Sequence, residues 1–299
     1  MRAVIDIGTN SVRLLITSEG ISVARDLIIT RLGRGVDHEG RLSQKAMDAT
    51  VQALLHLKEQ TDQYGVTPVV VATSAVRDAA NRREFIELVG ERLGWEVEVL
   101  SGDEEARFSF HGATAALQGR ALLEPAAVID IGGGSTEIYV GTAAGTLLSG
   151  GSVQVGAVRM TERHITGHPI DPMELRALED DVKRRLAPLV DNINKFSPQM
   201  LIGVGGTVTT LAVMSLQLLD YDPDTITGCE LTRDDIEAFY EELGRLSIAE
   251  RQQIPGLPPG RADILPAGTG ILWIICQMLG IDRCIVSDGD LLQGILAQF

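Results

Sequence analysis

The sequence predicts an α/β protein built from two similar halves, and three observations support this prediction. The chain has 299 residues, and about 150 residues per domain suggests two domains. Strand-like apolar segments alternate with helical segments along the chain. The sequence also repeats itself, because residues 4–11 and 128–135 are identical at six of eight positions. We therefore expect an internal duplication, with domains at residues 1–121 and 122–299.

Each copy of the repeat is predicted to form a strand, a tight turn and a second strand. The turn residues are Gly, Thr, Asn and Ser, which tolerate left-handed backbone or offer hydroxyl and amide groups. Later in each half, an apolar strand (residues 69–72 and 201–204) leads into a polar loop and a helix. The two halves therefore share one order of elements, as a duplication requires.

Capping residues and apolar periodicity predict the other elements. Ser43 is a suitable N-cap for a helix over residues 43–64, and Asp171 followed by Pro172 is typical of a helix start. The further elements that we expect are helices at residues 81–93, 101–117, 171–194, 261–279 and 288–297, and a strand at residues 96–100.

The net charge excludes some classes of partner. The chain has 26 basic and 41 acidic residues, so its formal charge is −15. Nucleic acids and anionic membrane surfaces attract a basic face, so we expect neither as a partner. No segment has the ~18 apolar residues of a membrane helix, and Asp6 interrupts any signal peptide. Three cysteines without CxxC spacing favour reduced thiols and a cytoplasmic location.

The two repeated turns suggest a phosphate site that includes a cation. Backbone N–H groups of such turns converge on an anion, and Ser11 and Ser135 add hydroxyl donors. Asp6 and Asp130, which precede the turns, would repel a bare phosphate. A magnesium ion removes this repulsion, because it binds one or two carboxylates together with phosphate oxygens and water. The alternative is a pair of ordinary hairpins in which Asp serves turn chemistry.

Other polar positions extend this candidate site. Glu137 lies on the strand face of Ser135 and is predicted to reach the same cation, whereas the first half has Arg13 at the matching position. Arg77 is placed to hold an anionic phosphate. Glu104 and Glu105 open a helix, where they either stabilise its first turn or supply a base that deprotonates water.

Taken together, the motifs resemble the exopolyphosphatase / guanosine pentaphosphate phosphohydrolase family (Ppx/GppA). The resemblance covers the whole chain in order and is specific as a set. The motifs that carry it are residues 6–11 (DIGTNS), 73–79 (TSAVRDA), 101–106 (SGDEEA), 130–137 (DIGGGSTE), 205–207 (GGT), 261–268 (RADILPAG) and 287–294 (SDGDLLQG).

The resemblance implies two ribonuclease-H-like domains, of the actin and sugar-kinase type, that enclose an interdomain cleft. It implies hydrolysis of a terminal phosphoanhydride bond with release of orthophosphate. Glu105 would be the catalytic base and Arg77 would neutralise the phosphoryl group, while Asp130, Glu137 and Asp6 would bind Mg²⁺ or Mn²⁺. The phosphate-binding residues that we predict are Thr9, Asn10, Ser11, Arg13, Ser74, Gly133, Gly134, Ser135, Gly206 and Thr207.

The resemblance leaves the substrate open between inorganic polyphosphate and guanosine penta- or tetraphosphate. Long family members have further C-terminal domains without a counterpart in these 299 residues, and the acidic charge predicts a preference for short chains or nucleotide. Two alternatives remain: an ATP-dependent kinase with an adenosine pocket at residues 266–270, and a guanosine tetraphosphate-binding regulator with little turnover. The apolar run at residues 271–279 is either core or the interface of a homodimer.

Overall fold

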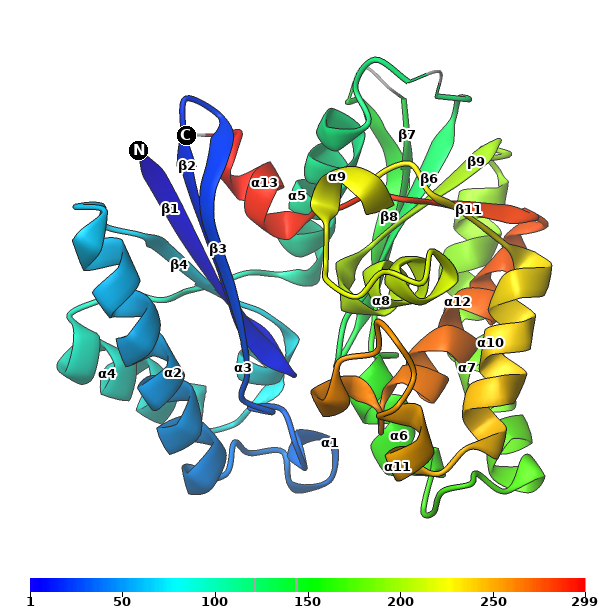
Figure 1. The fold of residues 1–299 in the computed structure, drawn as a ribbon, viewed down its shortest axis with the longest axis horizontal. Coiled ribbons are helices and arrows are strands. Elements are labelled where there is room, and N and C mark those ends of the chain that lie inside the picture. The colour runs from blue at the N-terminus through cyan, green and yellow to red at the C-terminus, as the bar shows by residue number, and fades with distance from the viewer. Residues whose placement is uncertain (121, 143–144, 299) are drawn as a thin grey trace.

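The computed structural model describes residues 1–120, 122–142 and 145–298. It forms two α/β units that stand side by side, each built on a mixed β-sheet (Figure 1). The strands of the first sheet are β1 (Arg2–Ile7), β2 (Ser11–Ser18), β3 (Ile21–Ile29), β4 (Val69–Ala72) and β5 (Glu98–Val99). Those of the second are β6 (Ala126–Ile131), β7 (Thr136–Gly141), β8 (Leu147–Val153), β9 (Met200–Val204), β10 (Glu230–Thr232) and β11 (Arg283–Val286).

The two sheets have the same strand topology. The first sheet has the order β3-β2-β1-β4-β5, and the second has β8-β7-β6-β9-β11 with β10 added at the edge. In both, the first strand pairs antiparallel with the second and parallel with the fourth. The predicted duplication and the two ribonuclease-H-like units are thus confirmed. The strand expected at residues 96–100 shortens to Glu98–Val99.

The predicted helix starts are confirmed where a side chain caps the helix. Ser43 accepts a hydrogen bond from the Ala46 N–H group, and Asp171 accepts one from Met173. The last helix begins three residues later than predicted because Asp290 is its N-cap. The helices are α1 (Val36–Glu39), α2 (Gln44–Gln63), α3 (Ser74–Asp78), α4 (Arg82–Leu93), α5 (Gly102–Ala116), α6 (Ala157–His164), α7 (Pro172–Asn194), α8 (Gly205–Ser215), α9 (Pro223–Ile226), α10 (Arg233–Arg245), α11 (Ile248–Arg251), α12 (Leu265–Leu279) and α13 (Leu291–Leu296).

A separate apolar core lies beside each sheet. In the first unit, α2 and α4 pack on the sheet, and in the second unit α7, α8 and α12 do so. The run at residues 271–279 belongs to α12, where Ile271, Ile274 and Ile275 are fully buried, so the core accounts for its apolar character. Within the described part of the chain, no helix has both the length and the apolar character that crossing a bilayer takes.

Two helices connect the units by crossing between them. α5 follows the last strand of the first sheet, yet Phe110 and Ala113 pack it onto the second sheet. α13 ends the chain, yet Leu291 and Ile295 pack it onto β1 of the first sheet. The two helices also contact each other in the middle of the molecule (Figure 1). The boundary between residues 121 and 122 remains a prediction, and Ala121 lies outside the described residues.

Candidate active site

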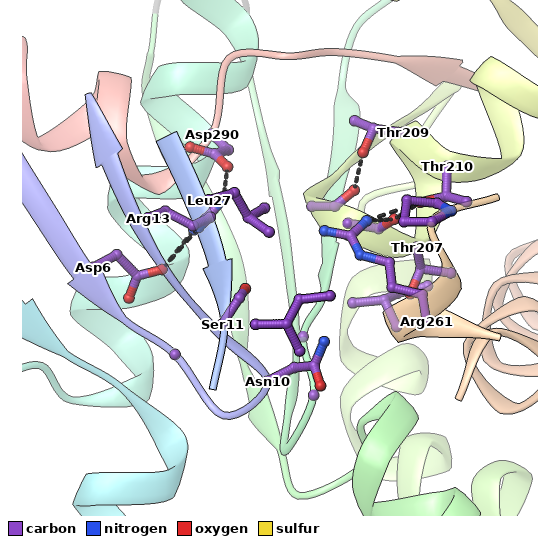
Figure 2. A pocket seen from close by; sticks show the side chains of 18 of the residues that line it. Asp6, Asn10, Ser11, Arg13, Leu27, Thr207, Thr209, Thr210, Arg261 and Asp290 are labelled. Atoms are coloured by element: carbon purple, nitrogen blue, oxygen red, sulfur yellow. Dashed lines mark hydrogen bonds and ion pairs between the residues drawn. The ribbon is translucent and has the colours of Figure 1, made fainter. Parts of the chain in front are cut away.

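A cavity of about 710 Å³ lies between the two units, and most of the predicted site residues line it. Figure 2 shows Asn10 and Ser11 on the side of the first sheet, with Thr207 and Arg261 facing them from the second unit. The lining includes Asp6, Thr9, Asn10, Ser11, Arg13, Ser74, Glu105, Asp130, Gly133, Gly134, Ser135, Gly206 and Thr207. Arg77 and Glu137 are not among the lining residues, but each is next to one: Arg77 contacts Glu105, and Glu137 pairs with Asp130.

The two repeated turns have the same closure. The Gly8 N–H group donates to the Ser11 carbonyl at 3.0 Å, and the Gly132 N–H group donates to the Ser135 carbonyl at 3.0 Å. The turns also meet, because a Cβ atom at Gly133 would lie 2.9 Å from Thr9 Cβ. The sequence therefore brings the predicted phosphate loops of both halves to one place.

The third predicted loop, residues 205–207, is the first turn of a helix. α8 begins at Gly205 directly after β9, and Gly206 and Thr207 line the cavity. The free N–H groups of a helix N-terminus favour an anion, which agrees with the phosphate-binding role predicted for Gly206 and Thr207. Gly205 has φ +80°, and a Cβ atom at this position would overlap Asp130 Oδ1. Only glycine therefore lets α8 start this close to the carboxylate.

Two buried carboxylates of the second unit lie next to each other. Asp130 on β6 pairs directly with Glu137 on β7, so both side chains point to the same face of the sheet. Ser109 donates to Asp130 Oδ2 at 2.9 Å, and Ser152 donates to Glu137 Oε1 at 2.6 Å. Burial, reinforced by repulsion from Asp290, raises the pKa of Asp130 to about 6. Burial and repulsion from Asp130 raise the pKa of Glu137 to about 7.

The adjacent acids Glu104 and Glu105 have different environments. Glu104 is exposed and completes a capping box with Ser101, whose hydrogen bonds lower the pKa of Glu104. Glu105 is only 8% exposed and lines the cavity. Burial and repulsion from Glu137 raise the pKa of Glu105 well above its ordinary value. The helix-stabilising role therefore belongs to Glu104, which leaves Glu105 available at the cavity.

Arg77 contacts Glu105, which lines the cavity. Its Nη1 atom donates to Glu105 Oε2 and to the Leu100 carbonyl, both at 2.9 Å. Its Nη2 atom is buried and has no hydrogen-bond partner among the described residues. This geometry orients Glu105, whereas the contact between Arg77 and phosphate stays a prediction.

Asp6 and Arg13 form the equivalent pair in the first unit. Arg13 lies opposite Asp6 on the paired strands and binds Asp6 Oδ2 through Nη2 at 2.7 Å. Arg13 also pairs with Asp290, so two carboxylates neutralise it (Figure 2). The predicted roles of Asp6 as a metal ligand and Arg13 as a phosphate ligand remain untested by these contacts.

Unpartnered oxygens mark the positions available to a cation. Asp6 Oδ1 and Glu137 Oε2 are buried, and neither has a hydrogen-bond partner within the described ranges. Residues 1–120, 122–142 and 145–298 contain no group of three or more His, Cys, Asp or Glu side chains arranged to hold a metal. Magnesium does not need such a group, since it completes its shell with water and phosphate oxygens. The donors present therefore fit a cation that binds together with phosphate.

Arg261 is a cavity residue that the sequence reasoning did not assign to the site. Its Nη1 atom donates to Thr210 Oγ1 at 2.8 Å and to the Gly206 carbonyl (Figure 2). In the described part of the chain it forms no ion pair with a carboxylate, unlike Arg13. Burial, with repulsion from Arg13, lowers the pKa of Arg261 to about 10. The sequence feature that could have assigned Arg261 to the site is its position at the start of the motif at residues 261–268.

The cavity mouth contains further residues that sequence reasoning missed. Arg25 on β3 and Tyr221 in the loop after α8 both bind Asp288, which precedes α13. These three residues line the cavity, and they join the first sheet to the second unit. Asp288 belongs to the motif at residues 287–294, whereas Tyr221 stands in an acidic run with the composition of a solvated loop.

The residues at which the kinase alternative predicts an adenosine pocket, 266–270, do not line the cavity. Residues 266–270 are buried inside α12, and this part of the cavity lining ends at Leu265. These five residues therefore contribute to the core of the second unit.

Comparison with known proteins identifies the family. The Ppx/GppA phosphatase family model matches residues 16–299. The chain is 33% identical to exopolyphosphatase 2 of Mycobacterium tuberculosis over 311 residues, which covers 98% of this chain and 96% of that protein. The chain thus belongs to the Ppx/GppA phosphatase family.

Solved structures agree with this assignment. An exopolyphosphatase from Cytophaga hutchinsonii superposes with a TM-score of 0.91 at 27% identity, covering 99% of this chain and 96% of that one. The Ppx/GppA family member of Aquifex aeolicus superposes with a TM-score of 0.79 at 30% identity, with coverages of 99% and 96%. Both superpositions therefore include both α/β units described above.

Proposed function

We propose that this chain is a phosphohydrolase that releases orthophosphate from the end of inorganic polyphosphate, with guanosine pentaphosphate as a second candidate substrate. The observation that carries the proposal is the position of Glu105. Its buried carboxyl lines the cavity where the phosphate loops of both halves meet, and its pKa is raised. A base of this kind suits the deprotonation of water.

We infer that Mg²⁺ or Mn²⁺ takes part and that Asp130 and Glu137 hold it. The support is the pair of adjacent buried carboxylates, of which Glu137 Oε2 has no partner in the described structure. When bound, the cation supplies positive charge beside the phosphates. Asp6 is a weaker candidate ligand, because Arg13 already occupies its other oxygen.

The proposed step transfers one phosphoryl group to water. The water oxygen forms a bond to the terminal phosphorus while the bond to the bridging oxygen breaks. Glu105 accepts the proton from the water, and the bridging oxygen leaves with the electron pair as the new end of the shortened chain. Arg77 keeps the Glu105 carboxyl in place through the 2.9 Å hydrogen bond. Positioning and charge stabilisation account for most of the rate in such transfers.

The charges at the cavity favour short substrates. Among the arginines that line it, Arg13 pairs with Asp6 and Asp290, and Arg25 pairs with Asp288. Arg261 is the one without an acidic partner in the described residues. A long polyanion needs a row of free cations, so a few phosphates held by loops and a cation suit this site better.

Phosphate release from a series of polyphosphate lengths tests this proposal, with guanosine pentaphosphate and ATP alongside and with Mg²⁺, Mn²⁺ or a chelator. We expect metal-dependent release that is fastest on short chains. Rates that climb steadily into hundreds of phosphates would disprove the length preference. Tight binding of guanosine tetraphosphate with no phosphate release from any substrate would contradict the hydrolase proposal and indicate a regulatory protein. Transfer of a phosphoryl group from ATP to an acceptor would indicate a kinase.

A further inference from the structure

Arg159 on α6 joins the phosphate loops of the two units. Its side chain is only 10% exposed. Its Nε atom donates to the carbonyl of Gly134, in the β6–β7 turn, at 2.7 Å. Its Nη1 atom binds Asp37 on α1, and its Nη2 atom binds Asp78 Oδ2 on α3 at 2.7 Å. The three nitrogens of one guanidinium thus contact the β6–β7 turn, α1 and α3, and Nη2 also donates to Gln154 Oε1 at 2.6 Å.

The partner on α3 connects Arg159 to the cavity. α3 is a single short helix that begins at Ser74, which lines the cavity, and ends at Asp78. Ser74 Oγ also reaches the Asp78 carboxylate, at 3.4 Å. The same helix carries Arg77, which holds Glu105. A displacement of Asp78 would therefore move both a phosphate-loop residue and the support of the proposed base.

The Gly134 carbonyl connects Arg159 to the phosphate loop of the second unit, which is the β6–β7 turn. The N-terminus of α6 is hydrogen-bonded to the β6–β7 turn, because the Ala157 and Val158 N–H groups donate to the carbonyls of Gly132 and Gly133 at 2.9 and 2.8 Å. The Arg159 side chain turns back to the next carbonyl, that of Gly134. The turn is thus held from both the backbone and the side chain of one helix.

We propose that Arg159 is a positioning residue that fixes the spacing between the phosphate loops of the two units. This inference rests on the proposed function, because it concerns the geometry of that same site. The planar guanidinium suits the role, since it offers donors in several fixed directions at once. Loops that must grip one phosphoryl group from two units need such a rigid link, because a shift of ~1 Å can cost about a hundredfold in rate.

Arg163 provides a matched control. It lies one turn further along α6 and binds the same Asp37 across the units, with Nη2 at 2.6 Å. It contacts neither the Gly134 carbonyl nor Asp78 in the described structure. Substitution of Arg163 therefore removes an ion pair between the units and leaves both phosphate loops supported.

The experiment compares Arg159→Ala with Arg163→Ala in steady-state phosphate release from tripolyphosphate. For Arg159→Ala we expect kcat to fall at least about tenfold while KM changes less than about threefold, because the loss is one of alignment. For Arg163→Ala we expect kcat within about twofold of wild type. Equal losses in both variants, or no loss in either, would overturn the proposal. Asp78→Asn removes the charge of this one ion pair of Arg159 and provides the test if Arg159→Ala does not fold.

Hydrogen exchange supplies a readout that does not depend on turnover. In Arg159→Ala, the amides of residues 132–135 and 74–78 should exchange at least about tenfold faster, whereas in Arg163→Ala they should keep wild-type protection. Unchanged exchange in Arg159→Ala would contradict the positioning role. A wild-type protein without phosphate release would contradict the proposed function alone, and the exchange comparison would still decide the role of Arg159.

Discussion

At the scale of single residues, burial separates two acids that the sequence places side by side. Glu104 hydrogen-bonds Ser101 at the surface, and Glu105 faces the cavity from the same helical turn. A carboxyl group in water has a low pKa, whereas burial and a neighbouring carboxylate both raise the pKa of a carboxyl group. The pKa shifts of the two residues accordingly have opposite directions.

The first prediction contrasts these two acids. Glu105→Gln should lower kcat by about 10²–10⁴-fold, because the amide cannot accept a proton from water. Glu104→Gln should leave kcat within about twofold and lower the melting temperature slightly, because it weakens the capping box. Phosphate release and thermal unfolding of both variants provide the measurements. Near wild-type turnover of Glu105→Gln would remove Glu105 from the mechanism.

The second prediction concerns Arg261, whose charge has no acidic partner in the described residues. Arg261→Ala should raise KM about tenfold or more, because the substrate loses a contact with a desolvated cation. Arg25→Ala should raise KM less, since Asp288 already neutralises Arg25. The KM values of the two variants for tripolyphosphate provide the comparison, and a larger effect of Arg25→Ala would contradict the assignment.

The residues of the site differ in how far sequence alone could predict them. The repeat contains Asp6, Asp130 and the Gly- and Ser-rich turns. These residues could be predicted because the conformation of a tight turn depends mainly on the residues within it. Arg261 and Tyr221 come from separate loops, and only the tertiary fold brings their side chains to the cavity. The spacing rule for Glu137 correctly placed it beside Asp130, but the sequence contained no sign that Glu137 would be almost fully buried.

At the scale of elements, the contact between α5 and α13 depends on small residues. A Cβ atom at Gly112 on α5 would overlap the Asp290 carbonyl, and one at Gly294 on α13 would overlap the Phe108 carbonyl. The two backbones therefore touch where the units join. Because α5 also carries Glu105, this contact sets the position of the proposed base relative to the first sheet.

The third prediction tests this close contact. Gly112→Ala should destabilise the protein by about 1–3 kcal/mol, because the helices must separate to admit the methyl group. Gly90→Ala on α4 is the control, since its Cβ atom would meet only the Trp95 carbonyl at an ordinary 3.7 Å. There the better helix propensity of alanine should stabilise the protein by about 0.5–1 kcal/mol. Denaturant titration measures both, and equal effects would contradict the prediction.

At the scale of the whole molecule, the sequence repeat predicted the two-unit fold, and the crossing of α5 and α13 came only with the structure. The apolar faces of both helices were visible in the sequence as periodic patterns. Periodicity shows that a face is buried and contains no information on which sheet covers it. The choice of sheet depends on contacts such as Phe110 with the second sheet and Ile295 with the first, which are distant in sequence.

The last prediction follows from three buried acids, Glu105, Asp130 and Glu137, whose pKa values all lie above their ordinary values. The folded protein therefore binds more protons than the unfolded chain between about pH 4 and pH 7. The free energy of unfolding is therefore expected to fall as the pH rises through this window. A rise from 3.8 to about 6, as for Asp130, corresponds to about 3 kcal/mol.

Without divalent cations, the wild-type protein should therefore melt on the order of 5 °C higher at pH 5.5 than at pH 8. Adding Mg²⁺ should raise the melting temperature at pH 8 more than at pH 5.5, because the cation binds the ionised carboxylates. Acids with lowered pKa values, such as Asp37 and Asp181, act in the opposite direction only at lower pH. The variant Asp130→Asn with Glu137→Gln is the control and should show a smaller pH slope, since only Glu105 of the three acids still titrates, and should lose the response to Mg²⁺. If its pH slope and its response to Mg²⁺ equal those of the wild type, these two carboxylates neither titrate as described nor hold the cation.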